Sequence, residues 1–270
     1  MKKLDYSEIF EMSKKTNEGI FIPFIVAGDP DYDTSLEIAR TLVDNGADAL
    51  EIGFPFSDPV ADGASVQNAD LRAFESGMTI QKCFKFLEEL RNYTDKPIGL
   101  LLYYNLVYKY GIEEFYKKLS DIGINAVLIA DLPPEEATDA VNAANTYDLE
   151  QIFIVSQATT NERLKEITKN VGGFIYLASV MGTTGARARV EHDTTELIKR
   201  IKKHTDIPIC VGFGISKEEH VREVLNAGSD GAIVGSALIN IIADNLENYD
   251  DMFMKIADYI KTMKAATMRD

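Results

Sequence analysis

The residues best suited to acid–base chemistry occur together in the stretch ALEIGFPFSDPVADG at residues 49–63. Glu51 is an acidic residue inside an apolar run, and Asp58 and Asp62 follow it in a segment rich in proline and glycine. A carboxyl group on a buried strand is destabilising unless it is paired or its pKa rises so that it keeps a proton. Two carboxyl groups in different environments can divide acid and base roles near neutral pH. The alternative is that Glu51 is neutralised by a lysine or a backbone amide and is only structural.

Three glycine-rich segments could hold an anion: MGTTGAR at 181–187, GFGIS at 212–216 and VGS at 234–236. Backbone N–H groups at a helix start bind anions without lysine, and glycine permits a close approach that a side chain would block. GFGIS lacks the third glycine of a dinucleotide fingerprint, and the chain has no Gly-Lys dipeptide for a Walker loop. Together the segments indicate a phosphate site, although each alone also fits an ordinary turn.

Other common catalytic patterns are missing from the sequence. The three histidines, His192, His204 and His220, have no metal-ligand spacing and are expected at the surface or at helix caps. No G-x-S-x-G elbow occurs, which disfavours a hydrolase triad. Aromatic residues at predicted strand ends would either pack in the core or form walls for a flat apolar ligand. These aromatic residues are Phe24, Tyr103, Tyr176 and Phe213.

Apolar runs alternate with helical-period segments along the whole chain, which predicts a parallel sheet with crossover helices. The predicted strands are 20–26, 48–53, 97–103, 125–130, 150–155, 173–178, 207–212 and 230–234. The predicted helices are 6–14, 34–45, 80–92, 113–122, 134–147, 161–169, 194–204, 217–227 and 246–264. Similar joints of glycine followed by a strand recur at 45–53, 121–131 and 226–235, which favours a closed ring of like units. We therefore expect an α/β fold, a single (βα)8 TIM barrel, whose site lies at the carboxyl ends of the strands.

Charge and composition narrow the class of protein. The chain has 43 acidic against 28 basic residues, a net charge of −15 that would repel nucleic acid and anionic membranes. Cys83 and Cys210 are far apart and are expected to be buried thiols in a reducing compartment. No leader-like apolar segment follows the first residues, and no run is long enough to span a membrane. We expect a cytoplasmic enzyme that acts on an anionic small molecule.

Several of these segments together resemble one family. The chain is similar to the alpha subunit of tryptophan synthase over nearly its whole length, and the E-x-G-x-P-[FY]-S-D-P-x-A-D-G segment is the most specific match. The matching segments are PFIVAGDP (23–30), LEIGFPFSDPVADG (50–63), LLYYNLVYKYG (101–111), ADLPPEE (130–136), YLASVMGTTGAR (176–187) and VGFGIS (211–216). The resemblance implies one domain, with an N-terminal helix in 1–18 and a barrel in 19–270.

The resemblance also implies a reaction, the retro-aldol cleavage of indole-3-glycerol phosphate into indole and glyceraldehyde 3-phosphate, without metal or organic cofactor. It assigns proton transfer to Glu51. It assigns to Asp62 the role of the carboxylate that accepts a hydrogen bond from the indole N–H and stabilises the cationic form of the ring. The substrate pocket would be formed by Phe24, Leu101, Tyr103, Leu128, Ala130, Ile154, Tyr176, Thr184 and Phe213. The phosphate would be held by Gly185, Gly214, Gly235 and Ser236.

The family works with a beta subunit that carries pyridoxal phosphate, in an alpha2-beta2 complex through which indole passes. The resemblance places the contact at Pro55, Asp58 and the loop near 183–189. Small and charged residues in 180–193 predict a loop that is weakly ordered without ligand and in which Thr184 orients Asp62. Ala64, Thr183 and the pair at 157–158 depart from the commonest family pattern. Two alternatives stay open: a catalytically weak subunit that activates the beta chain, and another phosphate-binding barrel enzyme such as an isomerase.

Overall fold

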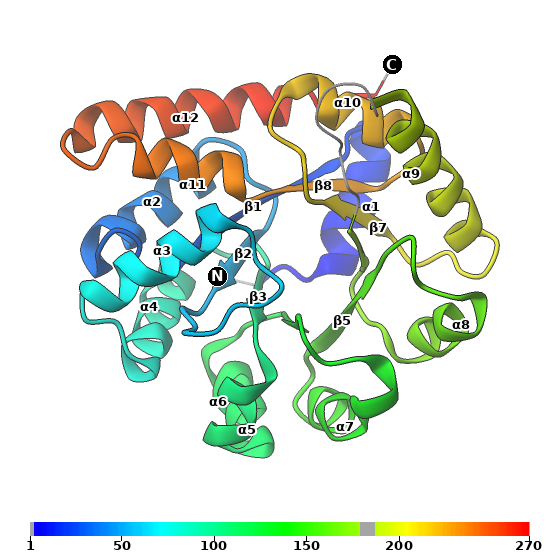
Figure 1. Ribbon diagram of the computed structural model, residues 1–270, viewed down its shortest axis with the longest axis horizontal. Helices are drawn as coiled ribbons and strands as arrows, with labels where there is room; N and C mark the ends of the chain where they lie inside the picture. The colour runs from blue at the N-terminus through cyan, green and yellow to red at the C-terminus, as the bar shows by residue number, and fades with distance from the viewer. Residues whose placement is uncertain (1–2, 179–186, 270) are drawn as a thin grey trace.

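Eight parallel strands close into a barrel in which each strand pairs with the next along the chain and β8 pairs with β1 (Figure 1). The computed structural model describes residues 3–178 and 187–269, with the side chains of 187–193 left out of the description. The strands are β1 Ile20–Val26, β2 Leu50–Gly53, β3 Ile98–Leu102, β4 Ala126–Ile129, β5 Glu150–Val155, β6 Ile175–Ala178, β7 Ile209–Gly212 and β8 Gly231–Val234. The predicted barrel is confirmed, because strands buried on both faces appear in the sequence as continuous apolar runs.

Helices surround the barrel and connect successive strands (Figure 1). They are α1 Tyr6–Thr16, α2 Tyr32–Asp44, α3 Ala64–Glu75, α4 Ile80–Tyr93, α5 Tyr104–Tyr110, α6 Ile112–Ile122, α7 Thr138–Thr146, α8 Asn161–Asn170, α9 Arg187–Lys202, α10 Glu218–Asn226, α11 Ser236–Ala243 and α12 Tyr249–Ala265. The single helix predicted at 134–147 is a 3₁₀ turn η1 Pro134–Glu136 followed by α7. Helix α9 begins at Arg187 rather than near residue 194.

Three helices, α3, α5 and α11, were not predicted from the sequence. None of them has a side-chain hydrogen bond at its N-cap, where Gly63, Tyr103 and Gly235 stand. By contrast, the N-caps of α2 and α4 are Asp31 and Thr79, whose side chains accept a hydrogen bond from a backbone N–H of the first turn. A capped start makes a helix easier to predict, but α6, α7 and α10 were predicted although they too have no side-chain hydrogen bond at the N-cap.

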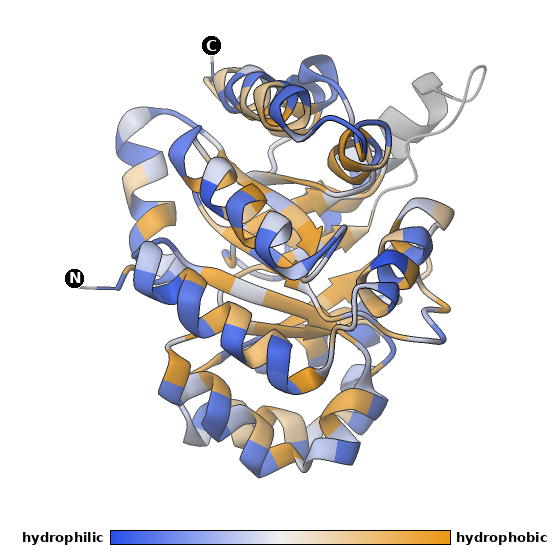
Figure 2. Ribbon diagram, turned by 90° about the vertical axis from the view of Figure 1, so that its left-hand side faces the viewer, coloured by the Kyte–Doolittle hydropathy of each residue, from blue (hydrophilic) through white to orange (hydrophobic). Residues whose placement is uncertain are grey.

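Apolar side chains form two layers, one inside the barrel and one between the barrel and its helices. The inner cluster contains alternate strand residues such as Ile22, Leu128 and Ile233. The outer cluster contains their sequence neighbours, because successive strand residues point to opposite faces. Figure 2 shows this as hydrophobic strands at the centre with helices that are hydrophobic toward them.

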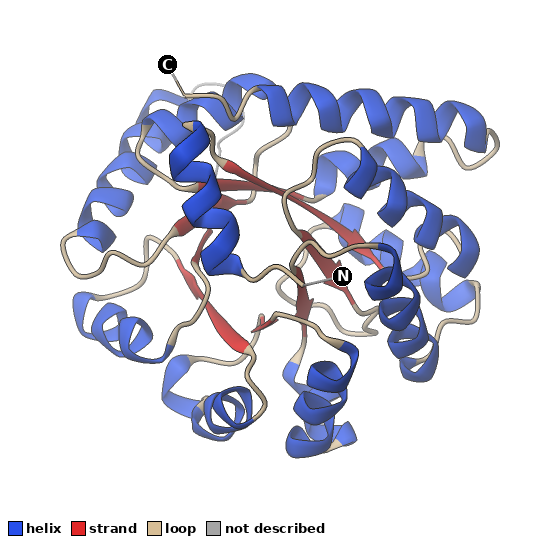
Figure 3. Cartoon of the chain, turned by 180° about the vertical axis from the view of Figure 1, so that it is seen from behind, coloured by secondary structure: helices blue, strands red, loops and turns tan. Residues whose placement is uncertain are grey.

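Helix α1 closes the end of the barrel at which the strands begin. Asp5 and Glu8 form a capping box at its start, and Tyr6, Ile9 and Phe10 pack into the inner cluster. Seen from behind, the helix near the N-terminus crosses this end of the barrel (Figure 3). A ligand can therefore enter only from the opposite end, where the strands finish.

The turn after β1 is tied to α3 by an ion pair. Arg72 donates two hydrogen bonds to the Asp29 carboxylate, at 2.6 and 2.9 Å, and Asp29 is only 1% exposed. Paired donors of this kind offset the cost of burying the carboxylate. Cys83 and Cys210 are both buried thiols, as predicted. Within the described residues, no helix is long and apolar enough to cross a membrane.

Candidate active site

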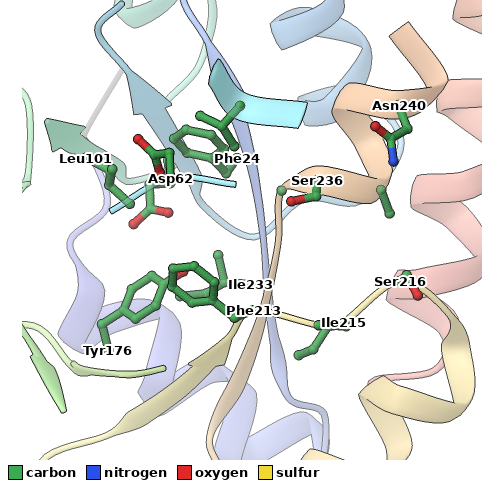
Figure 4. Close-up of a pocket in the computed structure, with 15 residues that line it drawn as sticks. Phe24, Asp62, Leu101, Tyr176, Phe213, Ile215, Ser216, Ile233, Ser236 and Asn240 are labelled. Carbon is green, nitrogen blue, oxygen red and sulfur yellow. The ribbon is translucent and has the colours of Figure 1, made fainter. Parts of the chain in front are cut away.

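A cavity of about 260 Å³ opens at the carboxyl ends of the strands (Figure 4). Residues from both ends of the sequence line it: Phe24, Glu51, Asp62, Val66, Leu101, Tyr176, Phe213, Gly214, Ile215, Ser216, Ile233, Gly235, Ser236, Ala237 and Asn240. Both predicted catalytic residues, Glu51 and Asp62, are among them, as are all three predicted phosphate residues that the structure describes, Gly214, Gly235 and Ser236. One part of the cavity thus contains the side-chain carboxyl groups of Glu51 and Asp62, and another part is lined by glycine-rich backbone.

Glu51 lies on β2, in register with Phe24 of β1 and Gly99 of β3. Its side chain is 3% exposed, and within the described part of the chain its Oε2 atom has no hydrogen-bond partner. Burial, with a smaller contribution from the negative charge of Asp62, raises the pKa of Glu51 to about 8. The described geometry therefore does not support a capped, purely structural Glu51, and the group is mostly protonated at neutral pH.

Asp62 lies on the loop between β2 and α3 and is half-buried. The Tyr103 hydroxyl donates to its Oδ2 atom at 2.7 Å, and the same hydroxyl accepts from the backbone N–H of Ala61 at 3.0 Å. Burial raises the pKa of Asp62, and the hydrogen bond from Tyr103 opposes that rise. The two carboxyl groups in one cavity therefore differ in environment, with Glu51 favoured as an acid and Asp62 as an anion.

Apolar side chains form the wall next to the carboxyl groups. Phe24, Leu101, Tyr176 and Phe213 lie around the space in Figure 4, and the rings of Tyr176 and Phe213 meet edge to face with centroids 6.1 Å apart. Phe213 has φ +69°, a strained conformation for a bulky residue, and its side chain is 46% exposed at the mouth. A flat aromatic ligand fits this wall better than a polar one.

The opposite end of the cavity is built from backbone. Helix α11 begins at Ser236, and its N-cap Gly235 leaves the first-turn N–H groups without a side-chain cap. A Cβ atom on Gly235 would lie 3.1 Å from Phe24, and Gly214 has φ +75°, so both positions favour glycine. Backbone amides and the helix dipole can hold a phosphate here despite the chain's negative charge.

Some of the predicted residues lie elsewhere. Tyr103, Leu128, Ala130 and Ile154 do not line the cavity; the last three pack in or against the inner cluster, and Leu128 and Ile154 pair with the cavity residues Leu101 and Tyr176. Pro55 is buried in the wall of a second cavity, and Asp58 is exposed with a hydrogen bond from Ser57. Thr184, Gly185 and the rest of 179–186 lie outside the described residues, and the second half of the predicted 180–193 loop is the beginning of helix α9.

Four cavity residues were not predicted: Val66, Ile233, Ala237 and Asn240. Ile215 and Ser216 belong to the predicted glycine-rich segment at 212–216, and Asn240 is one turn beyond Ser236. A helix predicted over 236–243 would have placed Asn240 on the same face as Ser236, but no helix was predicted there. His220 accepts from the backbone N–H of Ser216, which agrees with the capping position expected for a histidine.

Comparisons with known proteins agree on one family. The profile of the tryptophan synthase alpha chain family matches residues 10–268. The tryptophan synthase alpha chain of Methanothermobacter thermautotrophicus is 56% identical over 265 residues, which cover 98% of this chain and 97% of the relative. That of Photobacterium profundum is 45% identical, covering 97% and 98%.

Solved structures give the same result. The tryptophan synthase a2b2 complex of Pyrococcus furiosus, described as a case of mutual activation, contains a chain that superposes with a TM-score of 0.84 at 34% identity. That match covers 92% of this chain and 98% of the other. A Mycobacterium tuberculosis tryptophan synthase chain matches with a TM-score of 0.89 at 28% identity, covering 100% of both chains.

Proposed function

The chain belongs to the tryptophan synthase alpha chain family, which cleaves indole-3-glycerol phosphate to indole and glyceraldehyde 3-phosphate, and we propose that Glu51 and Asp62 carry out that reaction here. The observation that carries the proposal is a buried Glu51, one carboxyl oxygen of which has no hydrogen-bond partner among the described residues, in one cavity with Asp62. A protonated acid and a carboxylate anion are the two groups that this cleavage requires.

Glu51 first transfers its proton to the indole ring carbon that bears the glycerol chain. The ring becomes cationic, and the Asp62 carboxylate accepts a hydrogen bond from its N–H and offsets the charge. The Glu51 carboxylate then removes the proton of the adjacent glycerol hydroxyl. The carbon–carbon bond breaks, its electron pair returns to the indole ring, and the hydroxyl carbon becomes the aldehyde. Glu51 is protonated again, so the cycle closes without net proton loss.

The apolar wall and the backbone cradle orient the substrate for these steps. The indole lies against Phe24, Tyr176 and Phe213, and the phosphate lies at Gly214, Gly235 and Ser236. Holding both ends fixes the reacting carbon near Glu51, and this orientation lowers the entropic part of the barrier. The chemistry uses only acid, base and hydrogen bonds from this chain, and on this proposal the alpha reaction takes no cofactor.

A partner subunit completes the proposal. Pyridoxal phosphate belongs to the beta subunit of this family, and the Pyrococcus furiosus relative is described as an a2b2 complex. We propose the same assembly for this chain, with Pro55 and the exposed Asp58 at the contact. We also propose that residues 1–270 form one domain, with the N-terminal helix in 1–18 and the barrel in 19–270, and that it acts in the cytoplasm. A merely activating subunit would have no use for an orphaned acid beside Asp62, which disfavours that alternative.

The test is release of indole from indole-3-glycerol phosphate by the purified chain, with and without a beta subunit. Asp62→Asn keeps the size of the side chain and removes its charge, so kcat should fall by roughly 100-fold or more while ligand affinity changes little. Asp121→Asn is the matched control, because Asp121 is an exposed carboxylate on α6. No indole release by the wild type in either condition, or full activity of Asp62→Asn, would contradict the proposal.

A further inference from the structure

Phe56 connects the loop after β2 to the residue that holds Asp62. Its ring stacks on the ring of Tyr103, with centroids 4.9 Å apart and planes inclined by 18°. Among the described ring contacts, this is the one that is stacked. Phe56 also lines a second cavity of about 220 Å³, which we name the lateral cavity, together with Pro55, Phe74 and Met78. Phe56 therefore lies between the lateral cavity and the active-site loop.

Tyr103 transmits this contact to Asp62. Its hydroxyl accepts from the Ala61 N–H, so its own proton is directed to Asp62 Oδ2. The hydroxyl oxygen lies on the axis about which the ring turns, so it leaves both partners only when the whole Tyr103 side chain swings about χ1. The stacked ring of Phe56 covers a face of that phenol and opposes such a swing.

The backbone of Phe56 is held as well. Its N–H interacts with the carboxyl group of Asp70 on α3, and Asp70 is only 4% exposed. Helix α3 is in turn tied to the turn after β1 by the ion pair of Arg72 with Asp29. The backbone of Phe56 is thus held against α3, while its ring lies on Tyr103.

We propose that Phe56 is a positioning residue for the cleavage reaction, which fixes the Tyr103 hydroxyl and through it the Asp62 carboxylate at the cavity. The inference rests on the proposed function, in which Asp62 supports the cationic indole. Loss of the Phe56 ring should affect the transition state, in which that charge exists, more than the binding of substrate. It should therefore lower kcat and leave KM nearly unchanged.

The proposal also predicts a shift in the pH profile. The titratable groups that face Asp62 are Glu51 from β2, Tyr103 after β3, Tyr176 from β6 and Asp70 from α3. Of these, the Tyr103 hydroxyl is the group that stabilises the Asp62 anion by a hydrogen bond. If that bond weakens, the pKa of Asp62 rises, and the acidic limb of the kcat/KM profile moves to higher pH.

The experiment compares Phe56→Leu with Phe74→Leu in the purified chain with its beta subunit. Phe74 lines the same lateral cavity and is 41% exposed, and among the described residues it has no ring contact. Phe56→Leu should lower kcat roughly 10- to 100-fold with KM within about twofold, a typical result of a small misplacement. It should also move the acidic limb of the kcat/KM profile to higher pH, whereas Phe74→Leu should change neither kcat nor the position of that limb. Phe56→Tyr keeps a ring that can stack, so kcat and the position of the acidic limb should stay close to those of the wild type.

Tyr103→Phe keeps the ring and removes only the hydroxyl, so it tests the inference even if Phe56→Leu folds poorly. It should move the acidic limb in the same direction, and adding Phe56→Leu to it should cause little further loss. An acidic limb that stays in place in Phe56→Leu or in Tyr103→Phe overturns the inference, as does equal behaviour of Phe56→Leu and Phe74→Leu. Asp62→Asn measured beside them keeps the two proposals apart. If it is inactive while the Phe56 variants behave as the control does, only this inference is wrong.

Discussion

Replacing Glu51 by glutamine should stabilise the protein at neutral and alkaline pH while it removes catalysis. Glutamine keeps the shape of the side chain and cannot ionise. Acid–base catalysis contributes roughly 10² to 10⁴-fold, so kcat for indole release should fall by at least that factor. The expected gain in stability comes from the same burial that makes Glu51 useful as an acid.

The size of the gain follows from the pKa of Glu51, about 8 in the folded chain against an ordinary value of 4.5. Below the ordinary value, both folded and unfolded states are protonated and the charge costs nothing. As the pH rises from there toward 8, the unfolded chain ionises first, so the free energy of unfolding falls by about 1.4 kcal/mol for each pH unit. The total is roughly 3–5 kcal/mol, a large part of the 5–15 kcal/mol that is typical of a domain.

Urea unfolding of the wild type and Glu51→Gln at several pH values between 4.5 and 8.5 measures this difference. The midpoint of Glu51→Gln should exceed that of the wild type increasingly as the pH rises, and the gap should become constant above about pH 8. The gap should be smaller in an Asp62→Asn background, because the charge of Asp62 is a secondary cause of the raised pKa. A gap that does not change with pH would refute the assignment of a buried, protonated Glu51, and retained turnover would refute its catalytic role.

Two further substitutions test the two ends of the cavity. Gly235→Asp places a negative charge at the start of α11, so the affinity for glyceraldehyde 3-phosphate should fall by about 100-fold while indole still binds. Calorimetry measures both affinities, and Gly235→Ala is the control that separates the effect of charge from that of size. Unchanged affinity in Gly235→Asp would mean that the phosphate binds elsewhere. Gly212→Ala adds a Cβ that would overlap the hydroxyl of Tyr176, so Tyr176 must move into the cavity and kcat/KM should fall by roughly tenfold. The same Cβ would also overlap the ring atoms Cζ and Cε1, which phenylalanine keeps, so adding Tyr176→Phe should recover little of that loss. Full recovery would show that the ring itself is not displaced.

The amino-acid sequence by itself determined the barrel and the residues with the chemistry. All eight strands were predicted, because each is an apolar run between glycine-containing joints, and Glu51 stood out as an acid within such a run. Local signals of this kind depend on residues that are adjacent in the chain. The prediction missed α3, α5 and α11, which have no side-chain cap and of which the last two are only seven and eight residues long.

Only the tertiary structure decided which side chains line the cavity and which partners they have. Alternation along a strand predicts which residues point inward, and Leu128 and Ile154 do so, but it does not say which inward side chains border the cavity and which are covered by their neighbours. The hydrogen bond from Tyr103 to Asp62 joins residues 41 positions apart, and no spacing in the sequence encodes it. The orphaned oxygen of Glu51 is likewise a property of its surroundings. Residue types set which chemistry is available, whereas the packing of distant segments sets each group's solvation and partners, and therefore its pKa and its use.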